Sequence, residues 1–330
     1  MLRSRLLFFV LVAWSCTALA QPLTAYKYVR AGNGEAHTVS SRAGFALMGG
    51  GTDLDEAFRW LCERAAGGDF LVLRASGDED YNPYIQKLCP LNSVATLILP
   101  NREAALDPFV ANTIREAAGI FIAGGDQAKY INFWQGTPVE TELNAAIGRG
   151  VPIGGTSAGL AVLGEYAYSA QGDQPKDPNL DAKTAFADPG GPRITLTKGL
   201  VAIPILKGII TDTHFARRNR MGRLLVFLAR LKEDGKTVRG VGVEQAAAVL
   251  LEPSGAARVV GKGDAYFVDA GKAAGILAKG AAFAYGPFSV EKVEPGHTFN
   301  VKAWSGGGAV YALSVKDGAI QSTQAGGAVY

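Results

Sequence analysis

Ser157 lies in a Gly-x-Ser-x-Gly frame within "PIGGTSAG", residues 152–159, directly after a short apolar run. A turn of this kind between a strand and a helix exposes the serine hydroxyl for nucleophilic attack, and its glycines let the backbone turn without a Cβ clash. The amide of Ala158 would then lie at the start of the helix, where it can donate to an oxyanion. The same pattern also suits a small residue in a tight Gly-rich loop, so both interpretations stay open.

A serine nucleophile needs a base, and the sequence has 3 histidines. His37 lies in a polar N-terminal segment and His297 in a turn, whereas His214 follows an apolar run in "TDTHFARRNRMGR". If imidazole activates Ser157, His214 is therefore the well-placed candidate. Taken alone, His214 is better explained as an ordinary residue at the start of a helix.

Four arginines lie within ten residues of His214: Arg217, Arg218, Arg220 and Arg223. A guanidinium binds a carboxylate through two parallel hydrogen bonds, so this cluster favours an anionic substrate. Some of the four are expected to form salt bridges with neighbouring loops instead. Their charge would also lower the pKa of His214 unless a carboxylate, such as that of Asp212, offsets it.

The segment "AGGDQ", residues 123–127, also follows an apolar run. Gly125 would present a second backbone amide to an oxyanion, and Gln127 would orient the substrate. The alternative is a plain turn in which Asp126 caps a helix.

Short apolar runs alternate with helical patterns along most of the chain, which is typical of an α/β fold with a doubly wound, mostly parallel sheet. We expect strands over residues 44–48, 69–75, 93–99, 120–123, 151–154 and 208–215. In such a sheet, ligands bind outside the carboxyl ends of the strands, where Ser157, Gly125 and His214 each fall. After about residue 245 the pattern changes to short strands with Gly-rich turns. We therefore expect an α/β catalytic domain over 21–250 and a β-rich extension over 251–330, packed on the same domain.

The first 20 residues contain Arg3 and Arg5, an apolar run and a small-x-small ending at Ala20, which predicts a secretory signal peptide over 1–20. We therefore expect a secreted or periplasmic protein. Removal of the two arginines would leave a net charge of about +1 from the +3 of the whole chain, which favours neither a nucleic acid nor a membrane as partner. The apolar fraction of 48% and charged fraction of 19% suit a packed soluble core.

Cys62 and Cys89 are the cysteines that remain after cleavage. An even pair in an oxidising compartment favours a disulfide, and two buried free thiols are the alternative. Neither cysteine has the spacing of a metal site, and we expect no metal or organic cofactor.

Three motifs, "GGDQ", "GTSAG" and "DTHFARRNRMGRL", occur in an order that resembles cyanophycinases and the related serine peptidases that include aspartyl dipeptidases. The resemblance covers roughly residues 40–250. It implies a flavodoxin-like α/β fold, akin to class I glutamine amidotransferases, with Ser157 as nucleophile and His214 as general base. A homodimer is common in this family.

The resemblance also implies which residues contact the substrate: Gln127, Asp212, Thr213, Arg218, Arg220 and Arg223. Two positions depart from the family pattern. Thr213 stands where the cyanobacterial enzymes usually carry Gln, and "GVGVEQ", ending in Glu244 and Gln245, replaces a "GIGIDE"-like segment. The family places an acidic residue between the serine and the histidine, which here predicts Asp173 as the third triad member, with Glu165 and Asp177 as alternatives.

Together these features predict an exported serine hydrolase that cleaves aspartyl peptide bonds. Its expected substrate is cyanophycin, a poly-aspartate that carries arginine on each β-carboxyl, and its product would be β-Asp-Arg dipeptides. An exported aspartyl dipeptidase-like enzyme is the first alternative. A catalytically silent periplasmic binding protein of the same fold is the second.

Overall fold

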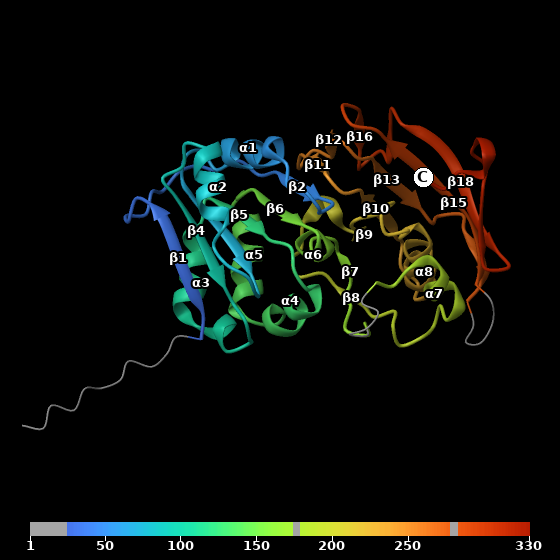
Figure 1. Ribbon diagram of the computed structural model, residues 1–330, viewed down its shortest axis with the longest axis horizontal. Helices are drawn as coiled ribbons and strands as arrows, with labels where there is room; N and C mark the ends of the chain where they lie inside the picture. The colour runs from blue at the N-terminus through green and yellow to red at the C-terminus, as the bar shows by residue number, and fades with distance from the viewer. Residues whose placement is uncertain (1–24, 174–178, 278–282) are drawn as a thin grey trace, which may run out of the picture.

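Two β-sheets lie side by side in the computed structural model, which describes residues 25–173, 179–277 and 283–330 (Figure 1). The expected signal peptide over 1–20 lies outside the described residues. In the first sheet the strand order is β1 (Lys27–Gly32), β4 (Ser93–Ile98), β3 (Asp69–Arg74), β5 (Gly119–Ile122), β6 (Ile153–Thr156), β2 (Phe45–Met48), β11 (Ala247–Leu251), β12 (Ala256–Gly261), β16 (Thr298–Asn300) and β17 (Ser305–Gly306).

The central strands of this first sheet, from β4 to β2, run parallel, and the flanking β1 and β11 run antiparallel to them. Helices α1 (Asp55–Arg64) and α2 (Tyr81–Leu88) pack on one face through Phe58 and Ile85. Helices α3 (Pro108–Glu116), α4 (Gln127–Trp134) and α5 (Pro138–Gly148) pack on the other face. The first sheet is therefore a doubly wound α/β layer of the kind that the alternating sequence pattern predicts.

The second sheet has the order β19 (Ala319–Ser322), β18 (Ala309–Lys316), β15 (Ala284–Val293), β13 (Ala265–Asp269), β10 (Arg239–Val243), β9 (Ile209–Asp212), β7 (Tyr166–Tyr168) and β8 (Leu196–Lys198), and β14 (Ala274–Ile276) pairs with β15. Only β10, β9 and β7 run parallel to one another among its described strand pairs. One of its faces packs on α7 (Ala182–Ala187) and α8 (Met221–Glu233), and the other joins the core of the first sheet. The strand expected over 208–215 is β9, and it belongs to this second sheet. The sequence did not predict this, because an apolar run marks a strand without specifying its partners.

The segment 251–330 contributes strands to both sheets. It supplies β12, β16 and β17 to the first sheet and β13, β14, β15, β18 and β19 to the second. Short one-turn elements complete the chain: α6 (Ala158–Ala161) and the 3-10 turns Ala104–Leu106, Pro204–Leu206 and Ala325–Gly327. The β-rich end of the chain is therefore built into the same frame as the α/β part.

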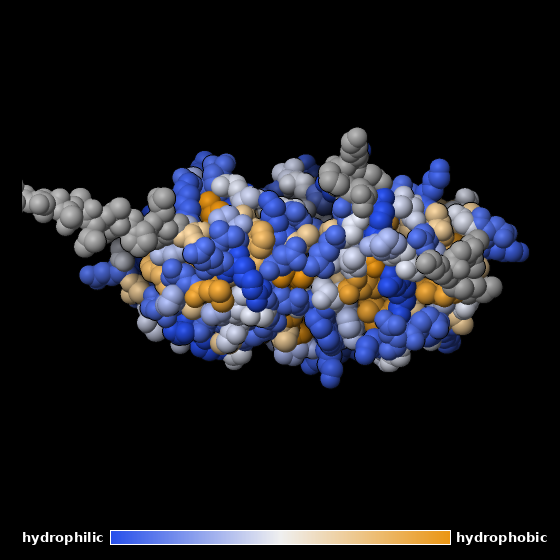
Figure 2. All heavy atoms as spheres, turned by 90° about the horizontal axis from the view of Figure 1, so that it is seen from below, coloured by the Kyte–Doolittle hydropathy of each residue, from blue (hydrophilic) through white to orange (hydrophobic). Residues whose placement is uncertain are grey.

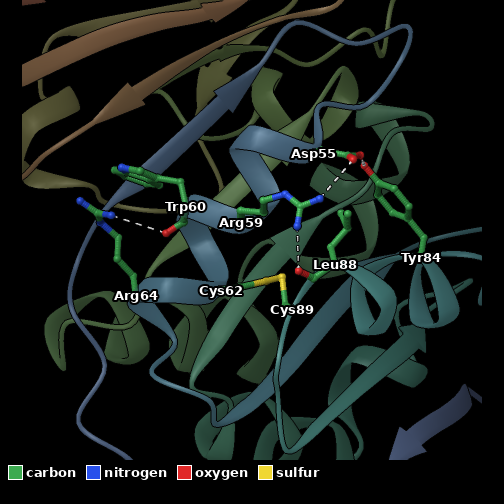
Figure 3. Close-up of a disulfide and its surroundings, with 8 residues drawn as sticks. All are labelled: Asp55, Arg59, Trp60, Cys62, Arg64, Tyr84, Leu88 and Cys89. Atoms are coloured by element: carbon green, nitrogen blue, oxygen red, sulfur yellow. Dashed lines mark hydrogen bonds and ion pairs between the residues drawn. A yellow bond between two sulfur atoms is a disulfide. The ribbon is translucent and has the colours of Figure 1, made fainter.

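Cys62 on α1 and Cys89 directly after α2 form a disulfide, which confirms the expected pairing (Figure 3). Arg59 reinforces the same helix pair, since it donates to the carbonyl of Leu88 at 3.1 Å and lies 3.6 Å from Asp55. The bridge joins the two helices that cover one face of the first sheet.

The outer surface is mainly polar on the face seen in Figure 2, where apolar residues occur in separate groups among hydrophilic ones. Within the described ranges, the large apolar side chains that are exposed are Leu106, Phe109 and Val310. Among the described residues, no helix has the length and apolar character needed to cross a bilayer.

Removal of the disulfide should lower the stability of the native state. The bridge closes a sequence separation of 27 residues, and the loss of that constraint on the unfolded chain is worth about 3–4 kcal/mol. We expect the Cys62→Ala/Cys89→Ala protein to unfold at a lower denaturant concentration than the wild type, and the reduced wild type to match it. A midpoint that reductant leaves unchanged would contradict the bridge.

Candidate active site

The candidate site lies where the carboxyl ends of strands from both sheets meet. Ser157 follows β6 of the first sheet, and His214 follows β9 of the second. The His214 amide donates to the carbonyl of Gly49, after β2, at 2.8 Å. A Cβ added at Gly49 would lie 2.0 Å from the carbonyl oxygen of Glu244, after β10. Only glycine therefore permits the close approach of the backbones that brings the two sheets together here.

The turn at Ser157 has the backbone conformation that a nucleophile elbow requires. Ser157 has φ +52° and ψ −117°, a strained conformation for a residue with a side chain. A Cβ at Gly159 would lie 2.0 Å from the carbonyl oxygen of Ile122, and one at Gly155 would lie 2.6 Å from the carbonyl carbon of Gly159. These contacts explain both glycines of the frame, and they favour a nucleophile elbow over a plain Gly-rich loop.

Ser157 and His214 meet across the junction. Ser157 Oγ lies 2.7 Å from His214 Nε2. The imidazole lies over Gly50, where an added Cβ would approach its Cε1 and Nε2 to 2.5 Å. His214 itself has φ +46°, in the left-handed region that a residue with a side chain rarely adopts. This is the hydrogen-bonded pair that nucleophilic catalysis needs.

The partner of His214 Nδ1 is Gln245, whose side-chain amide nitrogen Nε2 lies 2.7 Å away. The expectation that Asp173 supplies this third group is corrected, because the Asp173 carboxylate accepts from the Tyr168 hydroxyl and lies 3.9 Å from Arg193. Glu165 is also engaged elsewhere, with Lys198 and the Gly208 amide, and Asp177 lies outside the described residues.

The sequence did not predict Gln245 as the partner of His214, because the family pattern places an acidic residue between the serine and the histidine. The departure at "GVGVEQ" was the available signal, since Gln245 follows the end of β10 just as His214 follows that of β9. If Nε2 accepts the proton of Ser157, Nδ1 carries the other proton, and Gln245 must face it with its amide oxygen. A 180° rotation of the terminal amide exchanges its Nε2 donor for its Oε1 acceptor. Gln245 can therefore accept the Nδ1 proton of this tautomer.

A cleft of about 660 Å³ opens beside Ser157 and gathers most of the predicted site residues. Its walls include Gly125, Gln127, Ala158, Asp173, Thr213, Arg218, Arg220 and Arg223. Gly124 lies against Ser157, since an added Cβ there would be 3.5 Å from the serine Cβ. Asp126 also caps α4 by accepting from the Ala128 amide at 2.9 Å. The alternative interpretation of this turn as a helix cap therefore coexists with its place in the cleft.

Asp212 does not reach this cleft, in contrast to its expected role in substrate contact. It is buried and forms a two-point ion pair with Arg223, whose Nε donates to Asp212 Oδ2 at 2.8 Å. The Arg220 guanidinium donates to the carbonyl and hydroxyl oxygens of Thr213 at 3.0 and 3.1 Å. Burial is the main cause that lowers the pKa of Arg220 to about 9.

Arg218 differs from these two arginines because its side chain is exposed and has no hydrogen-bond or ion-pair partner in the described part of the chain. Arg217 is exposed as well but does not line the cleft. Arg218 is therefore the guanidinium that is free to bind an incoming carboxylate.

The turn that carries these arginines is fixed from two sides. The Glu244 carboxylate accepts from the backbone amides of Ala216 and Arg217, at 2.8 Å for Arg217, and also from that of Gln245 at 2.7 Å. On the other side, the Tyr330 hydroxyl accepts from the Met221 amide at 2.9 Å and donates to Asn219 Oδ1 at 3.1 Å. The β-rich end of the chain thus helps to position the site.

Burial, followed by the positive charges of Arg218 and Arg220, lowers the pKa of His214 to about 4. The imidazole is therefore neutral, and able to accept a proton, at neutral and mildly acidic pH. Within the described ranges, no group of three or more His, Cys, Asp or Glu side chains is placed to hold a metal ion.

Comparisons with known proteins identify the relatives of this chain. The model of "Peptidase family S51" matches residues 52–256. The cyanophycinase of Synechococcus elongatus is 28% identical over 246 residues, covering 71% of this chain and 70% of its own length. The cyanophycinase of Trichormus variabilis is 30% identical over 177 residues, covering 53% of each chain. A peptidase from an acI-B1 Actinobacterium shares the fold, with a TM-score of 0.51, 16% identity, and coverage of 79% of this chain and 98% of its own.

Substitution of Gly50 should separate the serine from the histidine. The new methyl group of Gly50→Ala would meet the imidazole at 2.5 Å, at a backbone φ of +95°. We expect activity to fall by about 10²-fold, because a displacement near 1 Å is enough for such a loss. Gly34→Ala is the matched control, since nothing lies within 4 Å of its added Cβ. Equal activities in the two variants, measured on folded protein, would contradict the geometry.

Proposed function

Because the chain belongs to peptidase family S51 and is a serine-type peptidase, we propose that it hydrolyses aspartyl peptide bonds, with cyanophycin as its main substrate. The observation that carries this proposal is the contact of 2.7 Å between Ser157 and His214 at the edge of an arginine-lined cleft. The relatives named above, which are cyanophycinases, support the choice of polymer.

In the proposed reaction, Ser157 Oγ attacks the carbonyl carbon of an aspartyl residue while His214 Nε2 takes the hydroxyl proton. His214 then returns that proton to the leaving amine, and water releases the acyl group by the same route in reverse. The amides of Ala158 and Gly125, which line the cleft beside the serine, are proposed to hold the oxyanion. Gln245 is proposed to hold the imidazole in place by accepting the Nδ1 proton through its amide oxygen.

The arginine wall gives the proposed substrate its class. In cyanophycin, the arginine attached to each aspartyl β-carboxyl retains a free α-carboxylate, and in a short aspartyl peptide the side chain supplies the carboxylate. Arg218 is proposed to bind this group through a two-point contact, supported by its exposure and free donors. Gln127 and Thr213, on the same cleft, are proposed to orient the acyl portion.

We also propose that the chain is exported, with cleavage after Ala20. The disulfide between Cys62 and Cys89 supports an oxidising destination. Export suits an enzyme that consumes polymer released from other cells.

Replacement of the nucleophile should abolish the release of dipeptide. We expect Ser157→Ala to lose more than 10³-fold in kcat on cyanophycin, read as β-Asp-Arg by mass spectrometry, because no acyl-enzyme can form. Short aspartyl peptides assayed in parallel decide between polymer and dipeptide as substrate. Dipeptide release at wild-type rate by Ser157→Ala would contradict the mechanism, and hydrolysis of neither substrate by the wild type would favour the silent binding protein.

Removal of the free guanidinium should weaken substrate binding. We expect Arg218→Gln to raise KM by about tenfold or more, since a charge-assisted contact is worth roughly 1.5–3 kcal/mol. Arg217→Gln is the matched control, because it removes the same charge one residue away and outside the cleft. Equal values of KM for the two variants would show that Arg218 does not bind the substrate.

A further inference from the structure

Among the described residues, the imidazole of His214 touches no carboxylate. Its Nε2 faces Ser157 and its Nδ1 faces the neutral amide of Gln245, both at 2.7 Å. The acids at the ends of β9 and β10 have other partners. Asp212 is paired with Arg223, and Glu244 accepts from three backbone amides. Within residues 25–173, 179–277 and 283–330, the positive charge that His214 acquires during catalysis therefore has no anion in contact with it.

The elements packed around His214 carry mainly positive charge. The Gly49–Gly51 loop and the Ser157 turn bring no titratable group to the ring. The following turn and α8 bring Arg218, Arg220 and Arg223, and β9 brings Asp212 as the opposing anion. After burial, Arg218 and Arg220 are the largest causes that lower the pKa of His214. These charges, together with burial, keep the base neutral but make it a weak acceptor of the serine proton.

We propose that the carboxylate of the substrate, bound by Arg218, supplies the negative charge that the site lacks beside His214, so that an anionic substrate strengthens the base that cleaves it. This inference rests on the proposed function. It makes Gln245 a positioning residue that orients the ring of His214 without contributing charge.

The proposal affects the transfer of the serine hydroxyl proton. It leaves Ser157 Oγ for His214 Nε2 and then passes to the leaving amine, so the imidazolium exists only between these transfers. When a carboxylate neutralises Arg218, the repulsion on the imidazolium falls and the pKa of His214 rises in the complex. An anionic substrate should therefore have a higher kcat as well as a lower KM than a neutral one.

The test compares two synthetic dimers of β-Asp-Arg, one with the natural carboxylate on the acyl-side arginine and one with a carboxamide there. If the enzyme cleaves only short aspartyl peptides, Asp-Xaa and Asn-Xaa peptides form the equivalent pair. We expect the wild type to lose more than tenfold in kcat on the neutral member. Gln245→Glu places a carboxylate against Nδ1, so its kcat on the neutral member should rise and its anionic-to-neutral ratio of kcat should fall toward one.

Gln245→Met is the matched control, since it keeps the length of the side chain and removes the hydrogen bond without adding charge. We expect it to lose kcat on both substrates and to keep the wild-type ratio. A second readout is the pH profile of the wild type. With the anionic substrate, the acid limb of kcat, which reports the complex, should lie at higher pH than that of kcat/KM, which reports the free enzyme. With the neutral substrate the two limbs should coincide.

Three results would overturn the inference. An equal wild-type kcat on both substrates, with only KM changed, would mean that the arginines bind without strengthening the base, and the peptidase function would stand. An unchanged ratio in folded Gln245→Glu would show that charge beside His214 does not matter. Hydrolysis of neither substrate class by the wild type would remove the proposed function together with the inference that rests on it.

Discussion

The hydrogen bond between Ser157 and His214 depends on how closely the two sheets approach at their junction. The serine follows β6 of the first sheet and the histidine follows β9 of the second, and both adopt backbone conformations that are unfavourable for residues with side chains. They are held there because Gly49 and Gly50 present bare backbone to Glu244 and to the imidazole. A strained pair of this kind persists only where the surrounding packing fixes it. Here the loops after β2 and β10 supply that packing.

Charge is the second constraint on the site. Buried ions are costly unless they are paired, and the two-point contact of Arg223, in the cleft wall, with the buried Asp212 meets this condition. Arg220 is buried largely among neutral acceptors from Thr213 and Asn179, and its pKa falls to about 9 as a result of burial. Arg218 is left exposed at the cleft. Among the residues that the structure describes, the cleft is suited to an anion because the guanidinium of Arg218 has free donors, whereas those of Arg223 and Arg220 already have partners.

The sequence allowed much of this to be predicted, because local patterns determine local structure. The strand-to-helix turn at Ser157 and the place of His214 at a strand end follow from apolar runs and glycines, and the fold brings these two residues together. The pairing of Cys62 with Cys89 was also confirmed. The division of the strands between two sheets was not predicted, because an apolar run does not reveal its neighbours. Gln245 was missed for the same reason, since its contact with His214 spans 31 residues and its neutral side chain lacks the character of a triad acid.

The central claim is that Ser157 is a nucleophile made reactive by His214, and labelling with a fluorophosphonate tests it most directly. The wild-type protein would be treated with the probe, digested, and analysed by mass spectrometry for the peptide that carries residue 157, alongside His214→Ala. The account predicts a single adduct on Ser157 in the wild type and a rate at least about 10²-fold slower in His214→Ala. An adduct on another serine, or equal rates of labelling in the two proteins, would contradict it.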